Sequence, residues 1–157
     1  MKPILNLIVI PLLVISDVYA CPACMSLSLS ETISEADAVI VGRRIDRQTG
    51  NPTPKFITLE VLRVLKGQIT KRQINVRSYN GMCRDGIVIE DNNQYVVMLS
   101  SSGENYDSVS ISSPTRKCGI KTLKIERGKV VVEDIGRDKV RLTLDEFRQQ
   151  FGINQVR

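Results

Sequence analysis

The chain has 157 residues, of which 42% are hydrophobic and 25% charged, which suits one soluble globular domain with a modest core. It contains no histidine, which excludes Ser-His-Asp and Cys-His catalysis and removes the commonest zinc ligand, so we do not expect an enzyme. The net charge of +5 comes from scattered Lys and Arg, and aromatic residues make up only 4% of the chain, which argues against a nucleic-acid surface on which bases would stack.

Residues 1–20 have the pattern of a cleaved export signal. Lys2 precedes an apolar run over 4–15, and Val18-Tyr19-Ala20 places small or modest residues before the cut. The run has about half of the ~20 residues that a membrane span needs, so we expect no span. The mature protein would be secreted or periplasmic and would begin at Cys21. The alternative is a lipoprotein signal with a lipidated Cys21, but Tyr19 is bulky for the small-residue position of such a signal.

Short elements follow along the chain. Ser28 and Glu31 have the spacing of a capping box at the start of a helix over 28–36. Strands are expected at 38–42, 56–65, 73–79 and 94–99, the second with a bulge between Glu60 and Arg63. The strand at 94–99 is expected to be buried on both faces, because its apolar residues run without interruption.

The second half of the chain continues this pattern. Residues 100–105 are expected to form a flexible turn before a short strand at 109–111, and 123–132 a hairpin about Arg127-Gly128-Lys129. Thr143 and Glu146 form a second capping box, for a helix that ends at Gly152. Frequent short strands with a short helix near each end predict a mainly β fold, a small closed antiparallel barrel.

The four cysteines, Cys21, Cys24, Cys83 and Cys118, predict two disulfides in an exported domain. Pairing Cys21 with Cys24 would close a very small ring. Either other pairing joins Cys21 and Cys24 to the two distant cysteines. Disulfides that close long loops stabilise a fold the most, on the order of 4 kcal/mol each. We therefore favour a stapled N-terminus, that is, one held to the domain by two disulfides. A zinc tetrad is disfavoured because Cys83 and Cys118 stand alone. A thiol-redox motif at Cys21 and Cys24 would need a preceding strand in a βαβ unit.

A terminal cysteine, a second close behind it and a short helix lead into Ala36-Asp37-Ala38-Val39-Ile40-Val41-Gly42. A strand then ends in Leu65-Lys66-Gly67, Cys83 follows in a Gly-rich loop, and Cys118 follows an apolar strand. This order resembles the N-terminal domain of the tissue inhibitors of metalloproteinases (TIMP), the netrin-like (NTR) module, over about residues 21–120. The resemblance implies an OB-fold barrel at 21–135, with 136–157 as a C-terminal extension. It also implies the disulfides Cys21–Cys83 and Cys24–Cys118.

The resemblance further implies a metalloprotease inhibitor with no cofactor of its own. The Cys21 amino nitrogen and carbonyl oxygen would chelate the target's zinc in trans, and the contact ridge would comprise Cys21, Pro22, Ala23, Cys24, Met82, Cys83 and Arg84. We expect a monomer that binds a protein partner. The chain departs from the inhibitors, which have one residue between the first two cysteines, because here Pro22 and Ala23 make two. The alternatives are a non-inhibitory netrin-like module that binds a protein or a polyanion, and a thiol-redox protein using Cys21 and Cys24.

Overall fold

The computed structural model describes residues 25–46, 56–78, 87, 89–90, 92–108, 117–118, 121–133 and 138–153. The described elements, in chain order, are β1 (Met25–Ser26), α1 (Leu29–Glu35), β2 (Ala38–Arg44), β3 (Phe56–Lys66), β4 (Gln73–Arg77), β5 (Gln94–Ser102), β6 (Asn105–Ser108), β7 (Lys117–Cys118), β8 (Thr122–Glu126), β9 (Lys129–Val132), β10 (Val140–Leu142) and α2 (Leu144–Gln150). Within these ranges, no helix has the length and apolar character needed to cross a membrane.

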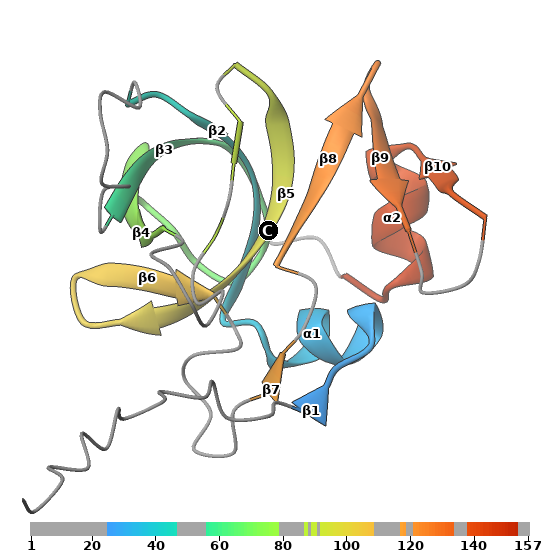
Figure 1. Ribbon diagram of the computed structural model, residues 1–157, viewed down its shortest axis with the longest axis horizontal. Coiled ribbons are helices and arrows are strands. Elements are labelled where there is room, and N and C mark those ends of the chain that lie inside the picture. Colours follow the sequence, from blue (N-terminus) through green and yellow to red (C-terminus); the bar gives the residue numbers. More distant parts are fainter. Residues whose placement is uncertain are drawn as a thin grey trace, which may run out of the picture.

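Five strands close into a small barrel, in the order β2-β3-β4-β6-β5 and back to β2 (Figure 1). Neighbouring strands are antiparallel except β4 and β6, which meet in parallel at Val76 and Tyr106. At this seam the Nε of Arg77 donates to Oδ1 of Asp107 at 2.8 Å, and the Asp107 side chain is 8% exposed. The structure is therefore mainly β, with a closed OB-fold-like barrel and two short helices, as the sequence predicts.

Strand β5 has two neighbours along one edge. Residues 99–102 pair with β6 in the barrel, whereas residues 94–97 pair with β8. From there β8, β9 and β10 continue the sheet away from the barrel, and α2 lies against β9 and β10 on the right of Figure 1. Arg127 and Gly128 both have positive φ, 49° and 76°, and form the two-residue turn of the predicted β8–β9 hairpin.

Two apolar cores lie on opposite faces of β2 and β5. Successive residues of a strand point to opposite faces. Along 38–41 and 95–99, the side chains therefore alternate between the barrel interior and a second core. The second core lies between these strands and the two helices, and Phe147 of α2 is fully buried in it. The uninterrupted apolar run at 94–99 thus reflects burial on both faces, as predicted.

The segment Leu65-Lys66-Gly67 joins β3 to the end of α1. Leu65 is buried in the second core, and Nζ of Lys66 donates to the carbonyl oxygens of residues 33 and 34, each at 2.8 Å. These are carbonyls near the end of α1, so Lys66 satisfies acceptors that the helix leaves open. Gly67 has φ +79°, and a Cβ there would lie 2.1 Å from the carbonyl oxygen of Asp37.

Both predicted capping boxes are confirmed, with Ser28 and Thr143 as the N-cap residues. The predicted bulge in β3 is also confirmed, because Val41 faces Arg63 while Gly42 faces Val61, leaving Leu62 without a partner.

The flexible turn predicted at 100–105 is wrong in extent. Strand β5 continues to Ser102 and β6 begins at Asn105, so Gly103 and Glu104 alone form the turn. The strand predicted at 109–111 lies outside the described residues. The sequence of β6 lacks the alternation of apolar and polar residues that is typical of a strand. Its buried residue is Asp107, whose carboxylate pairs with Arg77.

Candidate functional site

The predicted contact ridge, Cys21 to Cys24 together with Met82, Cys83 and Arg84, lies outside the described residues, as does the export signal. Of the four cysteines, only Cys118 is described, by its backbone in β7. Two flanking segments of the ridge are described, and they show what surrounds it.

The segment that directly follows Cys24 runs beside the segment that contains Cys118. Strand β1 pairs in parallel with β7, with Met25 opposite Lys117 and Ser26 opposite Cys118; Figure 1 shows the two strands side by side below α1. The chain then enters α1 through its capping box. The Ser28 N–H donates to the Glu31 carboxylate at 2.8 Å, and the Ser28 hydroxyl accepts from the Glu31 N–H at 3.2 Å. Pairing on one side and a helix cap on the other fix this short segment.

The connection that carries Met82, Cys83 and Arg84 leaves and re-enters the barrel at neighbouring points. Ser78 and Ile87 form a parallel bridge, and the Ile87 N–H donates to the Arg77 carbonyl at 3.1 Å. Ser78 and Ile87 are both 2% exposed. Residues 79–86 therefore join two adjacent, buried anchor points on the barrel.

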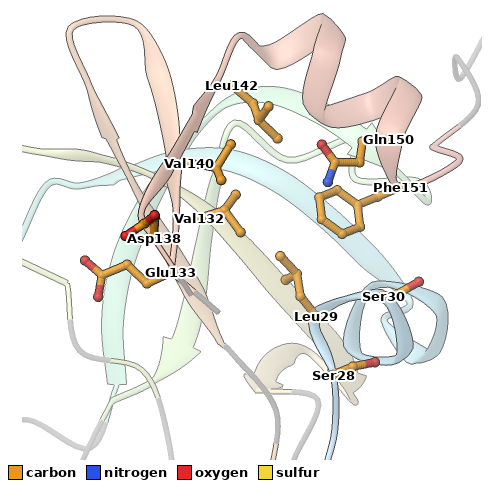
Figure 2. Close-up of a pocket in the computed structure, with 10 residues that line it drawn as sticks. All are labelled: Ser28, Leu29, Ser30, Val132, Glu133, Asp138, Val140, Leu142, Gln150 and Phe151. Carbon is orange, nitrogen blue, oxygen red and sulfur yellow. The ribbon is translucent and has the colours of Figure 1, made fainter. Parts of the chain in front are cut away.

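A groove of about 280 Å³ lies between α1, the β9 and β10 strands, and α2. Figure 2 shows apolar side chains from all four elements pointing toward one another across it, namely Leu29, Val132, Val140, Leu142 and Phe151. Polar side chains line the remainder, namely Ser28, Ser30, Glu133, Asp138 and Gln150. Because Ser28 is the N-cap of α1, one end of the groove begins four residues after Cys24.

An ion-pair trio lies on the outer face of β2 and β3. Nε and Nη2 of Arg43 each lie 2.7 Å from Oε2 of Glu60, and Nη2 of Arg72 lies 3.2 Å from Oε1. The hydrogen bond from Arg43 holds the pKa of Glu60 below its ordinary value of 4.5, against an opposing effect of burial and with a smaller contribution from Arg72. Glu60 is thus a charged partner of both arginines at neutral pH.

A second polar cluster surrounds the carboxylate of Glu90 beside the start of β5. Its Oε2 accepts from Asn93 Nδ2 at 3.0 Å, Lys124 Nζ at 3.2 Å and the Tyr95 hydroxyl at 3.4 Å. Burial raises the pKa of Tyr95, and the hydrogen bond to Glu90 raises the pKa of Lys124. Both groups therefore stay protonated at neutral pH, and neither is poised to abstract a proton.

Sequence reasoning missed the groove because its lining comes from four segments separated along the chain. Its local signals are weak: Val140 and Leu142 alternate over only three residues, and Phe151 lies four residues after Phe147, which already marks a helix face. Within the described ranges, no three Cys, Asp or Glu side chains come together as metal ligands would.

No protein-family model, curated protein or solved structure matches this chain.

Proposed function

We propose that the chain is an exported, disulfide-stapled protein of TIMP-like type that inhibits a zinc metalloprotease through its mature N-terminus. The Cys21 α-amino nitrogen and carbonyl oxygen would bind the target's zinc as a bidentate chelate. An α-amino group has a pKa of about 8, so it loses its proton at modest cost and donates a lone pair. A catalytic zinc keeps one coordination position open for water, and this position would accept the chelate.

The pairing of β1 with β7 is the observation that supports this function. Ser26 lies opposite Cys118, and Cys24 is two residues before Ser26. Covalent connectivity then limits the Cα–Cα separation of Cys24 and Cys118 to about 12 Å. A disulfide needs about 4.4–6.8 Å, which that limit permits. A Cys24–Cys118 disulfide would extend the β1–β7 contact toward Cys21.

The second proposed disulfide, Cys21–Cys83, would fasten the terminal residue to the connection 79–86. The two residues that flank this connection, Ser78 and Ile87, meet in a β-bridge on the barrel. A chelate held by two disulfides loses less conformational entropy on binding than a free N-terminus would. Pro22 and Ala23 would then face the protease beside Met82 and Arg84.

The first experiment is the intact mass of the exported protein, before and after reduction and thiol labelling. We expect a chain that begins at an unmodified Cys21 and shows no free thiol until it is reduced. A lipid adduct or a different first residue would refute chelation, because an acylated or absent amine cannot bind zinc. Free thiols at Cys21 and Cys24 would instead favour a thiol-redox protein.

The second experiment measures inhibition of a panel of purified zinc metalloproteases, with a serine protease as the specificity control. An extra Ala placed before Cys21 should abolish inhibition, because it converts the chelating amine into an amide. The matched control carries the same Ala after Arg157 and should inhibit fully. A stapled protein that inhibits no member of the panel would point instead to a non-inhibitory netrin-like module that binds a protein or a polyanion.

A further inference from the structure

The groove between α1, β9, β10 and α2 exposes apolar surface that the rest of the described fold does not cover. Val140 is 48% exposed, more than the other large hydrophobic side chains that the structure describes as exposed, Ile45 and Leu62. Phe151, Leu142 and Val132 are partly buried against the second core and form the floor beside it. The apolar surface of the groove is therefore continuous with the core of the molecule.

The size of the groove favours side chains over a whole small molecule. A cavity of 150 Å³ holds one benzene ring, so about 280 Å³ accommodates roughly two apolar side chains. Pockets for drug-sized ligands start at about 300 Å³ and enclose most of the ligand. At about 280 Å³ this groove is at the lower limit of that range.

The rim supplies a charge preference. Figure 2 shows Glu133 and Asp138 together at one side of the apolar floor. Glu133 pairs with Lys139, whereas Asp138 has no ion-pair partner among the described residues. A cationic group entering beside the apolar floor would meet the carboxylates of Asp138 and Glu133, of which Asp138 is unpaired among the described side chains, and an anionic group would be repelled.

The edge of the sheet supplies a backbone partner. Strand β10 ends the sheet order β10-β9-β8-β5, so among the described strands it is hydrogen-bonded to β9 alone. Val140 and Leu142 are two residues apart, so both side chains point to the groove, and no other described strand pairs with the second edge of β10. A peptide that adds to such an edge gains main-chain hydrogen bonds, and alternate side chains give it specificity.

We propose that this groove binds an extended segment of a partner protein, which inserts two alternate apolar side chains and places a Lys or Arg beside Asp138. The segment would lie along β10, with its apolar side chains over Val140 and Phe151. Such binding requires neither the Cys21 amine nor a metal, so it is independent of protease inhibition.

The test is a selection of random heptapeptides, displayed on phage, against the immobilised mature protein with its disulfides intact. We expect enriched peptides with apolar residues at i and i+2 next to Lys or Arg. Synthetic copies should bind the Val140→Lys variant about three- to tenfold more weakly, because Val140 is 48% exposed and about half of its side chain remains to be buried on binding. The matched control is Leu62→Lys, which alters an equally apolar side chain of similar exposure, 41%, on β3; it should bind as the wild type does.

The charge preference has its own variant. Asp138→Asn keeps the shape of the rim and should weaken the selected peptides by about two- to fivefold, the range of an exposed ion pair. The same peptides with norleucine in place of Lys should show no difference between the two proteins. Circular dichroism and urea unfolding of each variant establish that the fold is intact.

Three outcomes would overturn the proposal. Peptides that bind Val140→Lys as well as the wild type would place recognition elsewhere. Enrichment of acidic peptides, or of none above background, would contradict the chemistry of the rim and floor. Concentration-dependent dimerisation that Val140→Lys abolishes would show that a second copy, and not a partner's segment, covers the groove.

Discussion

The close approach of Gly67 to Asp37 predicts that Gly67→Ala is far more destabilising than a glycine substitution at the same backbone conformation elsewhere. Gly67 has φ +79°, and a Cβ would stand 2.1 Å from the Asp37 carbonyl oxygen, well inside any real Cβ contact. Gly128, in the β8–β9 turn, has φ +76° with nothing within 4 Å of the added Cβ. The two substitutions thus share the strain of positive φ, and only one adds a collision.

The expected cost follows from what Asp37 must give up in order to move. Its N–H donates to the Leu99 carbonyl at 2.9 Å, and its carboxylate accepts from the Ser101 N–H at 2.8 Å. Losing these two hydrogen bonds costs about 1 kcal/mol each, and Ala at positive φ costs about 1 kcal/mol more. Gly67→Ala should therefore lower the free energy of unfolding by about 3 kcal/mol, and Gly128→Ala by about 1 kcal/mol.

Urea unfolding of the oxidised protein, followed by far-ultraviolet circular dichroism, measures both free energies under the same conditions. The informative quantity is the difference between the two variants, expected at about 2 kcal/mol, because the conformational cost cancels. Equal destabilisation of the two variants would mean that Gly67 does not approach Asp37 in the folded protein. The reasoning about the junction of β3 and α1 would then be refuted.

Three further predictions concern other parts of the fold. Phe147→Ala, at a fully buried position of the second core, should lower the free energy of unfolding by about 3–5 kcal/mol in urea titrations, and a loss below about 1 kcal/mol would contradict its central place in that core. Asp107→Ala should cost about 1–3 kcal/mol, because it removes the buried acceptor that Arg77 uses at the β4–β6 seam; a wild-type midpoint in urea would show that the seam does not depend on this pair. Because the folded-state pKa of Glu60 is lowered, the stability that its ion pairs contribute is present above about pH 4.5 and is lost as the pH falls through the folded-state value. The free energy of unfolding of Glu60→Gln should therefore fall less than that of the wild type as the pH is lowered below about 4.5. An equal fall in both proteins would exclude Glu60 as a cause of the acid destabilisation.

The sequence predicted the elements whose local chemistry is self-contained. The capping boxes at Ser28 and Thr143 need only residues three positions apart, and the Arg127-Gly128 turn needs only positive φ. The strand at 94–99 was evident because burial on both faces leaves an uninterrupted apolar run. Each of these signals lies within a few consecutive residues.

What the sequence did not reveal depends on partners far along the chain. The polar sequence of β6 is typical of a loop, and the strand depends on the ion pair between Asp107 and Arg77, which lies 30 residues away. The two-residue strands β1 and β7 are too short to carry a pattern, and only their pairing identifies them. The groove likewise requires α1 and β10 to meet, and no local pattern in either segment indicates that meeting.

The apolar character of β5 on both faces has a consequence for how the chain folds correctly. A strand normally rejects a one-residue slip because the slip exposes its apolar side, but in β5 a slip only exchanges one apolar set for the other. Tyr95 breaks this degeneracy. Its ring lies in the barrel opposite Gly42, and its hydroxyl reaches Glu90. In a slipped strand that hydroxyl would enter the second core without an acceptor, at about 1–3 kcal/mol. The Tyr95 hydroxyl therefore contributes to holding β5 in its native register, a role that the apolar side chains of 96–99 cannot perform.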